Sequence, residues 1–319
     1  MIHPITQQLY SQMGLPVICS PMFIISNPTL LIEQCKNGII GSMPALNARP
    51  SSQLDEWLDE ISSTLKSETN KGFRIAPYAI NQIIHASNTR LDQDLALCEK
   101  YKVPLIITSL SAPNEITPLV HQWGGLVFHD VTTIRHAEKA IEAGVDGLIL
   151  VTAGAGGHAG TLNPFALLAE VRKFFDGPIA LAGAISSGRD ILAARVMGAD
   201  FVYMGTRFIV SKEANASASY QQMIVDSSAK DIIYTPFFTG IPGNYLRPSI
   251  IAAGLDPEKL HLLDKNNPDV NNFDAKAWKD IWGAGQGIGS IKQITSASEI
   301  ICQLKTEYQQ AKAQLTHLF

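Results

Sequence analysis

Eight short apolar runs, each followed by a segment with helical spacing, restrict the fold of this chain more than any other feature. The runs are apolar throughout rather than alternating, which is typical of parallel strands that helices bury on both faces. Strands that alternate with helices predict βα units, and eight units predict an α/β fold of the (β/α)₈ barrel class. The runs are 16–20, 38–42, 73–80, 103–108, 126–129, 147–151, 178–182 and 201–205.

The alternation breaks after the eighth run. Residues 212–274 contain Pro236, Pro242, Pro248, Pro257 and Pro268 among polar, helical and loop-like segments, so they predict an inserted, mostly helical subdomain. We therefore assign residues 1–211 and 275–319 to the barrel. Within the second barrel segment, a Gly-rich stretch at 282–289 is a candidate lid, and a helix at about 297–315 is expected to pack on the barrel exterior.

The composition excludes several kinds of partner. The 319 residues carry a net charge of -4 and contain no Lys/Arg run of five or more, so nothing indicates a nucleic-acid surface. The N-terminus lacks a basic start followed by an apolar run, and no stretch of about 18 apolar residues occurs. We expect a cytoplasmic protein without a membrane segment, and the sequence leaves a monomer and a homo-oligomer both open.

The four cysteines do not suggest a metal site. Cys19, Cys35, Cys98 and Cys302 form no CxxC pair and have no spacing that suits zinc. We expect them to be free, buried thiols.

The loops after the predicted seventh and eighth strands favour an anion site. In (β/α)₈ barrels, ligands bind at the C-terminal strand ends, and phosphate often binds after strands seven and eight. Gly183 with Ala184, and Gly205 with Thr206, occupy these positions, and glycine lets backbone N–H groups approach an anion closely. The alternative is that these residues only form tight turns at the barrel corners.

The loop after the predicted sixth strand, 152–160, reads TAGAGGHAG. Its small residues leave room for a flat ligand against the backbone, and His158 is the one residue in it with acid-base chemistry. A loop histidine often has only a surface or hydrogen-bonding role, but this position at the catalytic end of a barrel strand favours a catalytic one. The glycines do not match a dinucleotide fingerprint, because Gly160 falls one residue too late after Gly154 and Gly156.

Polar residues also stand near the ends of the predicted third, fourth and fifth strands. Asn81 follows the third strand and is a candidate to hydrogen-bond a ring carbonyl or amide, with a turn role as the alternative. Thr108 and His129 end the fourth and fifth strands, so both are candidate cofactor contacts. Asp130 comes next and is expected to cap the following helix.

Taken together, these motifs resemble the nitronate monooxygenase family, formerly called 2-nitropropane dioxygenases. The resemblance spans nearly the whole chain and rests on Pro21-Met22 after the first strand, GSMPALN after the second, Asn81, GAGGHAG and MGTRF. It implies a TIM barrel that binds FMN non-covalently, with the subdomain 212–274 covering the active site and His158 as the catalytic residue. It further implies phosphate contacts from Gly183, Ala184, Gly205 and Thr206, and a flavin ring near Pro21, Met22, Asn81, Ala155, Gly156 and Gly157.

The activity that the resemblance implies is oxidation of alkyl nitronates by molecular oxygen to carbonyl compounds and nitrite. This chain departs from some relatives, with Cys19-Ser20-Pro21 in place of a Gln-Gly-Gly lead-in, Asp130 in place of a lysine, and Gly183-Ala184 in place of paired glycines. These departures are compatible with the expected flavin site, but they bear on which substrate the protein accepts. The alternatives are an NAD(P)H-dependent FMN reductase of quinones or enoyl thioesters, and a non-catalytic binder of a flavin or a sugar phosphate.

Overall fold

The computed structural model describes residues 2–262 and 278–316, and its main body is a closed parallel barrel. Eight strands form one sheet in the order β1-β9-β8-β6-β5-β4-β3-β2. The two edge strands meet because Ile18 of β1 pairs in parallel with Ile40, next to β2. The barrel strands are β1 (Val17–Cys19), β2 (Gly41–Pro44), β3 (Tyr78–Ile84), β4 (Leu105–Leu110), β5 (Leu126–Val131), β6 (Gly147–Val151), β8 (Ile179–Ala182) and β9 (Phe201–Met204).

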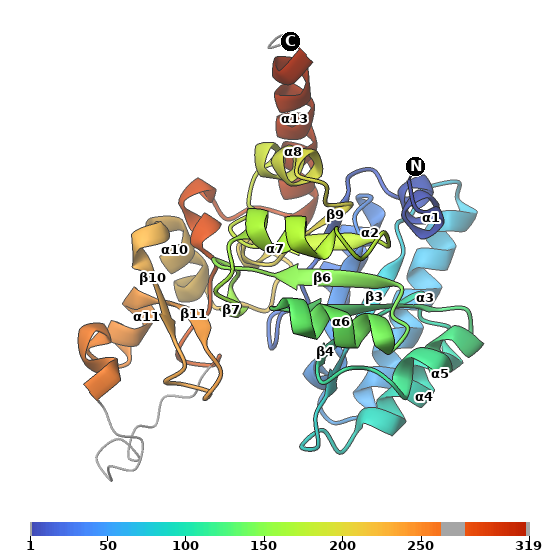
Figure 1. Ribbon diagram of the computed structural model, residues 1–319, viewed down its shortest axis with the longest axis horizontal. Helices are drawn as coiled ribbons and strands as arrows, with labels where there is room; N and C mark the ends of the chain where they lie inside the picture. The colour runs from blue at the N-terminus through green and yellow to red at the C-terminus, as the bar shows by residue number, and fades with distance from the viewer. Residues whose placement is uncertain (1, 263–277, 317–319) are drawn as a thin grey trace.

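Helices surround the barrel in the βα order that the sequence predicts (Figure 1). They are α1 (Pro4–Gln12), α2 (Pro28–Lys36), α3 (Gln53–Asn70), α4 (Leu91–Lys100), α5 (Ile116–Gln122), α6 (Ile134–Glu142), α7 (Pro164–Val171), α8 (Gly188–Val196), α9 (Thr206–Ile209) and α13 (Ala297–Thr316). Local signals set their ends. The side chains of Asn27, Thr133 and Ser187 accept hydrogen bonds from backbone N–H groups three residues on, which is N-capping. Gly144 follows α6 at a φ of 78°, a left-handed conformation that favours glycine.

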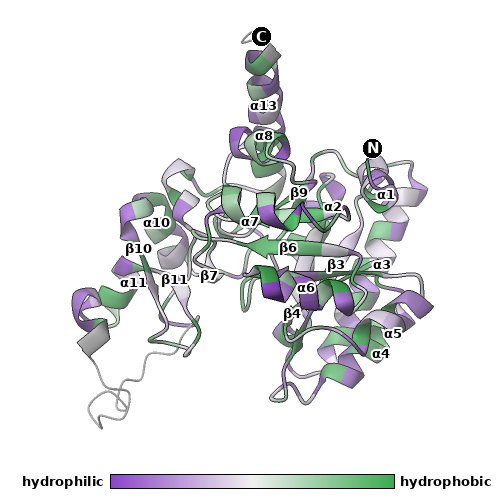
Figure 2. Cartoon of the chain, in the orientation of Figure 1, coloured by the Kyte–Doolittle hydropathy of each residue, from purple (hydrophilic) through white to green (hydrophobic). Residues whose placement is uncertain are grey.

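Apolar side chains fill both faces of the barrel sheet. The rings of Phe128 and Phe201 come from strands that are not neighbours, yet lie 6.4 Å apart, which places both inside the barrel. Leu9 of α1 and Met13, which caps the C-terminal end of this helix, pack in the same cluster and close the N-terminal end of the barrel. In Figure 2 the strand β6 has the colour of hydrophobic residues, and the neighbouring helix α6 carries both hydrophilic and hydrophobic residues. With the N-terminal end filled, the C-terminal strand ends remain for a binding site.

All eight predicted strands are present, but β3 is displaced from its predicted range. It begins at Tyr78 rather than Phe73 and continues to Ile84, so Asn81 lies inside the strand and not after it. The apolar run ends at Ile80, but the strand continues because Asn81 turns its polar side chain to a cavity rather than to the core.

Two further predictions from the sequence are wrong. Asp130 does not cap a helix, because it lies within β5, and the N-cap of α6 is Thr133, whose hydroxyl accepts from the N–H of His136. Cys302 is exposed on the C-terminal helix, whereas the other three cysteines are free and buried as expected.

The inserted segment lies beside the C-terminal end of the barrel (Figure 1). It contains α10 (Ala218–Asp226), η2 (Ala229–Asp231), α11 (Arg247–Ala252), η3 (Pro257–Leu262) and the strands β10 (Ile232–Thr235) and β11 (Gly243–Leu246). β11 pairs antiparallel with β10 and with β7 (Gly157–His158), a short strand from the loop after β6. The segment predicted to be mostly helical therefore also contains sheet. Its predicted boundary at 274/275 and Pro268 lie outside the described residues.

The C-terminal helix α13 packs on the barrel exterior against α8 and α2, as predicted. Gly188, the first residue of α8, donates its N–H to Glu307 Oε2 at 2.7 Å. A Cβ at Gly188 would lie 2.2 Å from the backbone N of Tyr308, so this close approach requires glycine. Among the described residues, no helix combines the length and the apolar character needed to cross a bilayer.

Candidate active site

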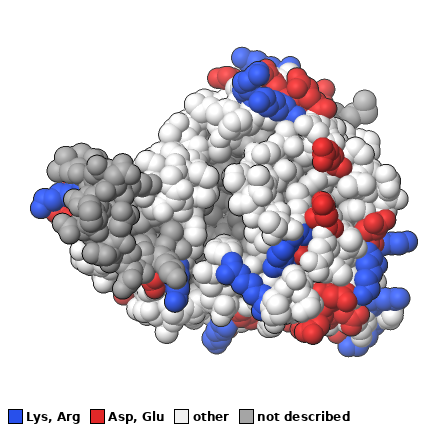
Figure 3. Space-filling view, turned by 90° about the horizontal axis from the view of Figure 1, so that it is seen from below, with Lys and Arg blue, Asp and Glu red and all other residues white. Residues whose placement is uncertain are grey.

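A cavity of about 780 Å³ lies at the C-terminal ends of the barrel strands. Its wall comes from the strand ends, the loop after β6, the subdomain and the Gly-rich stretch that includes η4 (Gln286–Ser290). This volume is within the range of small-molecule sites in proteins. On the face shown in Figure 3, a hollow lies near the centre, with few charged residues at its border.

The described residues that line the cavity include no Lys or Arg. Asp130 is the one carboxylate among them, and His136 and His158 are the imidazoles. Arg49 lies over the ring of the lining residue Phe23 but does not itself line the cavity. An anionic group bound here must therefore be held by backbone N–H groups, hydroxyls and imidazoles.

His158 lies in β7 and faces the cavity. The pairing of β7 with β11 sets His158 opposite Gly243 and so fixes the loop after β6. The imidazole Nε2 lies 2.9 Å from Thr239 Oγ1, and the ring of Trp278 meets it edge-on at a centroid distance of 5.3 Å. Burial lowers the pKa of His158 from its ordinary value, so the ring is neutral at pH 7.

The partners of Thr239 indicate which nitrogen of His158 carries the proton. The carbonyl oxygen of Ile241 lies 3.1 Å from Thr239 Oγ1, and because a carbonyl can only accept, the hydroxyl donates its proton there. With the hydroxyl proton directed to Ile241 O, Thr239 Oγ1 accepts from His158, and in that arrangement the imidazole carries its proton on Nε2. Nδ1 keeps its lone pair and can take up a proton.

Glycines bring the Gly-rich stretch into contact with the loop after β6. The backbone N–H of Gln286 donates to Gly154 O, and that of Gly285 donates to Thr206 Oγ1, both at 2.9 Å. A Cβ at Gly156 would lie 2.8 Å from the backbone N of Gly285, so a side chain there would push the two segments apart. The stretch that the sequence suggests as a lid is thus a hydrogen-bonded part of the cavity wall.

The loop after β8 has a left-handed backbone. Gly183 has a φ of 136°, and a Cβ on it would lie 2.3 Å from Thr152 Oγ1, so this position requires glycine. Ala184 has a φ of 55°, which costs a residue with a side chain about 1 kcal/mol or more. Both line the cavity together with Gly205, so the structure brings the two predicted phosphate loops together. The N–H of Ala184 already donates to Gly154 O at 3.3 Å.

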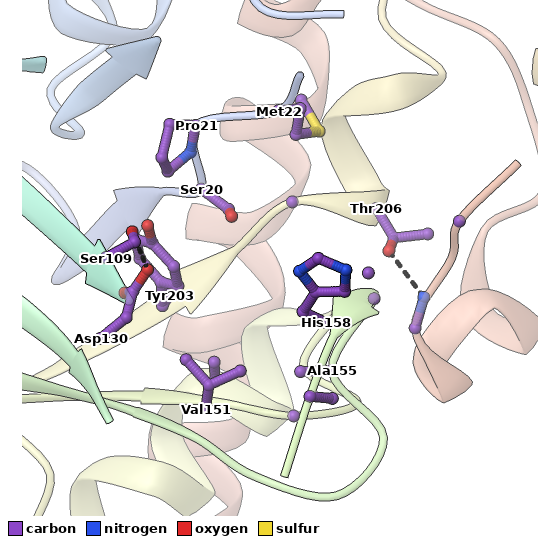
Figure 4. A pocket seen from close by; sticks show the side chains of 18 of the residues that line it. Ser20, Pro21, Met22, Ser109, Asp130, Val151, Ala155, His158, Tyr203 and Thr206 are labelled. Carbon is purple, nitrogen blue, oxygen red and sulfur yellow. Dashed lines mark hydrogen bonds between the residues drawn. The ribbon is translucent and has the colours of Figure 1, made fainter. Parts of the chain in front are cut away.

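Hydrogen bonds connect three neighbouring strands in another part of the wall. Asn81 Nδ2 of β3 donates to Ser109 Oγ of β4 at 2.9 Å, and Ser109 Oγ donates to Asp130 Oδ2 of β5 at 2.7 Å. Figure 4 shows Ser109, Asp130 and Tyr203 gathered together, apart from His158. Desolvation raises the pKa of Asp130 to about 7, although the hydrogen bond from Ser109 opposes the shift.

Two predicted contact residues do not line the cavity. Thr108 Oγ1 and His129 Nδ1 lie 2.8 Å apart in a buried hydrogen bond, and burial lowers the pKa of His129 to about 4. Because side chains alternate along a strand, Ser109 and Asp130 face the cavity instead. The other predicted contact residues all line it: Pro21, Met22, Asn81, Ala155, Gly156, Gly157, Gly183, Ala184, Gly205 and Thr206.

Among the residues that the sequence does not single out are Ser109, Tyr203 and Trp278, which line the cavity, and Thr239, which contacts His158. Strand alternation is the signal that could have found Ser109 and Tyr203, since each lies two positions after a buried, inward-facing apolar residue, Ile107 and Phe201. No local signal marks Thr239 or Trp278, because Thr239 lies in the subdomain and Trp278 in the segment that follows it, and both are far from His158 in sequence.

Comparison with known proteins shows the family. A family model described as nitronate monooxygenase matches residues 53–307. A nitronate monooxygenase of Paraburkholderia phytofirmans is 24% identical to this chain, and the alignment covers 94% of each protein.

Similar proteins also include some whose names describe other reactions. A 5-hydroxy-7a-methyl-1-oxo-octahydro-1H-indene-4-carboxyl-CoA dehydrogenase of Rhodococcus jostii is 26% identical over 74% of this chain, and the match spans 64% of that relative's length. Among solved structures, FabK from Thermotoga maritima has a TM-score of 0.80 at 23% identity, with all of both chains covered. This likeness shows the fold.

Proposed function

The chain belongs to the nitronate monooxygenase family and is an oxidoreductase, and we propose that it binds FMN in the strand-end cavity and oxidises alkyl nitronates. In the proposed reaction, two nitronate anions and one oxygen molecule give two carbonyl compounds and two nitrite ions. Bound FMN would supply the transfer of electrons from nitronate and the reaction with oxygen, which no side chain can perform. The protein would bind the reactants, exclude water and move a proton.

The lining residues fit a flat ring system with a phosphate chain. Gly183, Gly205 and Thr206 present backbone and a hydroxyl at the ends of β8 and β9. The hydroxyl of Thr206 accepts from the N–H of Gly285, so its own proton remains available to an anion. In the absence of lining cations among the described residues, such donors are what a phosphate requires here.

We assign the phosphate to Gly183, Ala184, Gly205 and Thr206. The flavin ring would lie against Pro21, Met22 and the three small residues of the loop after β6, Ala155, Gly156 and Gly157. Asn81, Ser109 and Asp130 provide amide, hydroxyl and carboxyl groups for the heteroatoms of the ring.

His158 is suited to remove the α-proton of a nitroalkane. Its Nδ1 is unprotonated, and the bond from Nε2–H to Thr239 Oγ1 holds the ring in this tautomer. The edge of Trp278 packs against the imidazole and helps to keep it neutral by excluding water. General-base assistance of this kind contributes typically about 10²- to 10⁴-fold in rate. Because His158 is neutral, the structure favours this role over the binding of nitronate oxygens by an imidazolium.

The observation that carries the proposal is the half-buried imidazole of His158, in contact with Thr239, beside a cavity walled by glycine backbone. The test is a visible spectrum of the purified protein and identification of any released flavin, followed by oxygen uptake and nitrite formation with nitroalkanes and nitronates. A yellow protein that releases FMN and consumes oxygen with nitronate is expected. A colourless protein, or a flavoprotein inert toward both substrates, contradicts the proposal.

A second candidate is an NAD(P)H-dependent FMN reductase of quinones or enoyl thioesters. The rim of the cavity favours an apolar substrate part, since Phe23, Leu110 and Ile241 line it and are each more than a third exposed. The named substrate of the Rhodococcus jostii relative is the CoA derivative of a methyl-substituted octahydroindene ring system. Anaerobic mixing with NADH distinguishes the two candidates, because rapid bleaching of the flavin is expected only for the reductase.

A further inference from the structure

Asp130 is a half-buried residue whose carboxyl group the proton transfer by His158 does not use. One oxygen, Oδ2, accepts the hydroxyl proton of Ser109 at 2.7 Å. That hydroxyl is itself oriented by Asn81, whose Nδ2 donates to Ser109 Oγ at 2.9 Å. The other oxygen, Oδ1, is shielded from water and has no hydrogen-bond partner among the described residues. The remaining accessible surface of Asp130 faces the cavity.

The surroundings of Asp130 do not compensate a negative charge. No described Lys or Arg lines the cavity. Tyr203, which faces Asp130 from β9, has a pKa raised well above its ordinary value, so it is neutral. His129, the neighbour in β5, is turned away and bonded to Thr108, and its pKa is lowered to about 4. The other titratable groups that line the cavity are His136 of α6, His158 of β7, Tyr220 of α10 and Tyr234 of β10. Burial raises the pKa of both tyrosines, so they are neutral.

An ionised Asp130 would leave Oδ1 as a charged oxygen without a donor, and such burial is costly. In the protonated acid, Oδ1 is a neutral carbonyl oxygen, and Oδ2 can accept from Ser109 while donating its own proton to another group. An apolar site that keeps a carboxylic acid neutral can thereby turn it into a hydrogen-bond donor. The pKa of about 7 agrees with this state near neutral pH.

We propose that Asp130 is a neutral carboxylic acid that donates a hydrogen bond from Oδ2 into the cavity, to the bound flavin, with Ser109 and Asn81 as its positioning residues. This inference rests on the proposed flavin binding but not on the nitronate reaction. The acid stabilises the negative charge that arrives when the flavin is reduced, as a lysine would, but without repelling or attracting a charged substrate beforehand. The negative charge of the reduced flavin in turn raises the affinity of Asp130 for its proton.

The first experiment measures the protonation of Asp130 directly. Infrared spectra of the wild type and of Asp130→Asn are compared at pH 6, without and with flavin. We expect a carboxylic-acid carbonyl band in the wild type that is absent from Asp130→Asn, and that shifts when flavin binds. The exposed Asp176→Asn is the matched control and retains the band. Identical spectra of the wild type and Asp130→Asn at this pH overturn the proposal.

The second experiment measures the midpoint potential of the bound flavin against pH. Above about pH 7, where Asp130 starts to ionise in the oxidised protein, reduction of the wild type takes up a further proton. The potential of the wild type then falls more steeply than that of Asp130→Asn, by up to about 30 mV per pH unit for one proton and two electrons. Equal slopes over the whole pH range contradict the contact with flavin.

A second variant keeps the proposal testable if Asp130→Asn does not fold. Ser109→Ala removes the donor that favours the ionised form, so the carboxylic-acid band should persist to higher pH than in the wild type. If the band disappears at the same pH in Ser109→Ala and in the wild type, the result contradicts a hydrogen bond from Ser109 to Asp130. A protein that binds no flavin contradicts the proposed function, and the infrared spectra then decide the protonation of Asp130 independently.

Discussion

His158 Nε2 and Thr239 Oγ1 lie 2.9 Å apart, although 81 positions separate the two residues in the chain. The contact exists because β7 pairs with β11, so that the connection from β10 to β11 passes beside the imidazole. The subdomain therefore sets the tautomer and the orientation of the residue that we propose as the base.

Replacing His158 by Ala tests its role as a base. We expect the rate with a neutral nitroalkane to fall about 10²- to 10⁴-fold, because the group that accepts the α-proton is lost. The rate with preformed nitronate should fall less, since that proton is already gone. Steady-state oxygen uptake with both forms of one substrate is the measurement. Equal losses with the two forms contradict the base role.

Thr239→Val tests whether the hydroxyl holds the tautomer of His158. The variant keeps the side-chain volume but leaves Nε2–H without its acceptor, so kcat with a nitroalkane should fall by up to about tenfold, the value of one hydrogen bond. Thr239→Ser keeps the hydroxyl and should retain most of the rate. The pH profile of kcat/KM should also change in Thr239→Val. A purely structural role of Thr239 predicts equal effects on nitroalkane and nitronate and no change of the profile.

Gly156→Ala tests the close contact between the loop after β6 and the Gly-rich stretch. The added Cβ would lie 2.8 Å from the backbone N of Gly285, and overpacking of this kind costs typically about 1 to 3 kcal/mol. We expect weaker flavin retention, measured as the dissociation constant of the cofactor. Gly289→Ala is the matched control in the same stretch, because its Cβ would meet nothing within 4 Å. Equal retention in both variants argues against a flavin beside Gly156.

Asp130→Asn should stabilise the fold in a pH-dependent way. The pKa of this acid is about 7 in the folded protein and near 3.8 in the unfolded chain, so the folded state binds more protons between these values. Stability of the wild type therefore falls as pH rises from about 4 to 7, and the loss stays constant above pH 7. The asparagine of the variant does not ionise, so the variant does not lose stability in this way as pH rises.

Urea unfolding at several pH values measures this difference. The free energy of unfolding of Asp130→Asn should exceed that of the wild type by up to about 4 kcal/mol at pH 8, the value of a shift of about three pKa units. The difference should vanish toward pH 4. Asp176→Asn, at an exposed position, should show no such dependence. A difference that is the same at pH 4 and pH 8 indicates a packing effect instead of a buried charge.

Local patterns were sufficient to predict the barrel and much of the candidate site. The apolar runs and the helix caps depend on residues close in sequence, and so do the glycine positions at the strand ends, of which Gly183 has a left-handed backbone. The ends of the strands were predicted less accurately. Asn81 interrupts an apolar run, yet it continues β3 because its side chain faces a cavity, a fact that no local pattern contains.

The sequence by itself determined the order of strands and helices, the barrel class and the glycine-rich loops that carry His158, since these follow from spacing and backbone freedom within a few residues. Only the tertiary structure decided that Ser109 and Asp130, rather than Thr108 and His129, face the cavity. It also decided that Thr239 meets His158 and that burial shifts the pKa values of both His158 and Asp130. The physical reason is that strand pairing between distant segments and the exclusion of water depend on the whole chain and not on neighbouring residues.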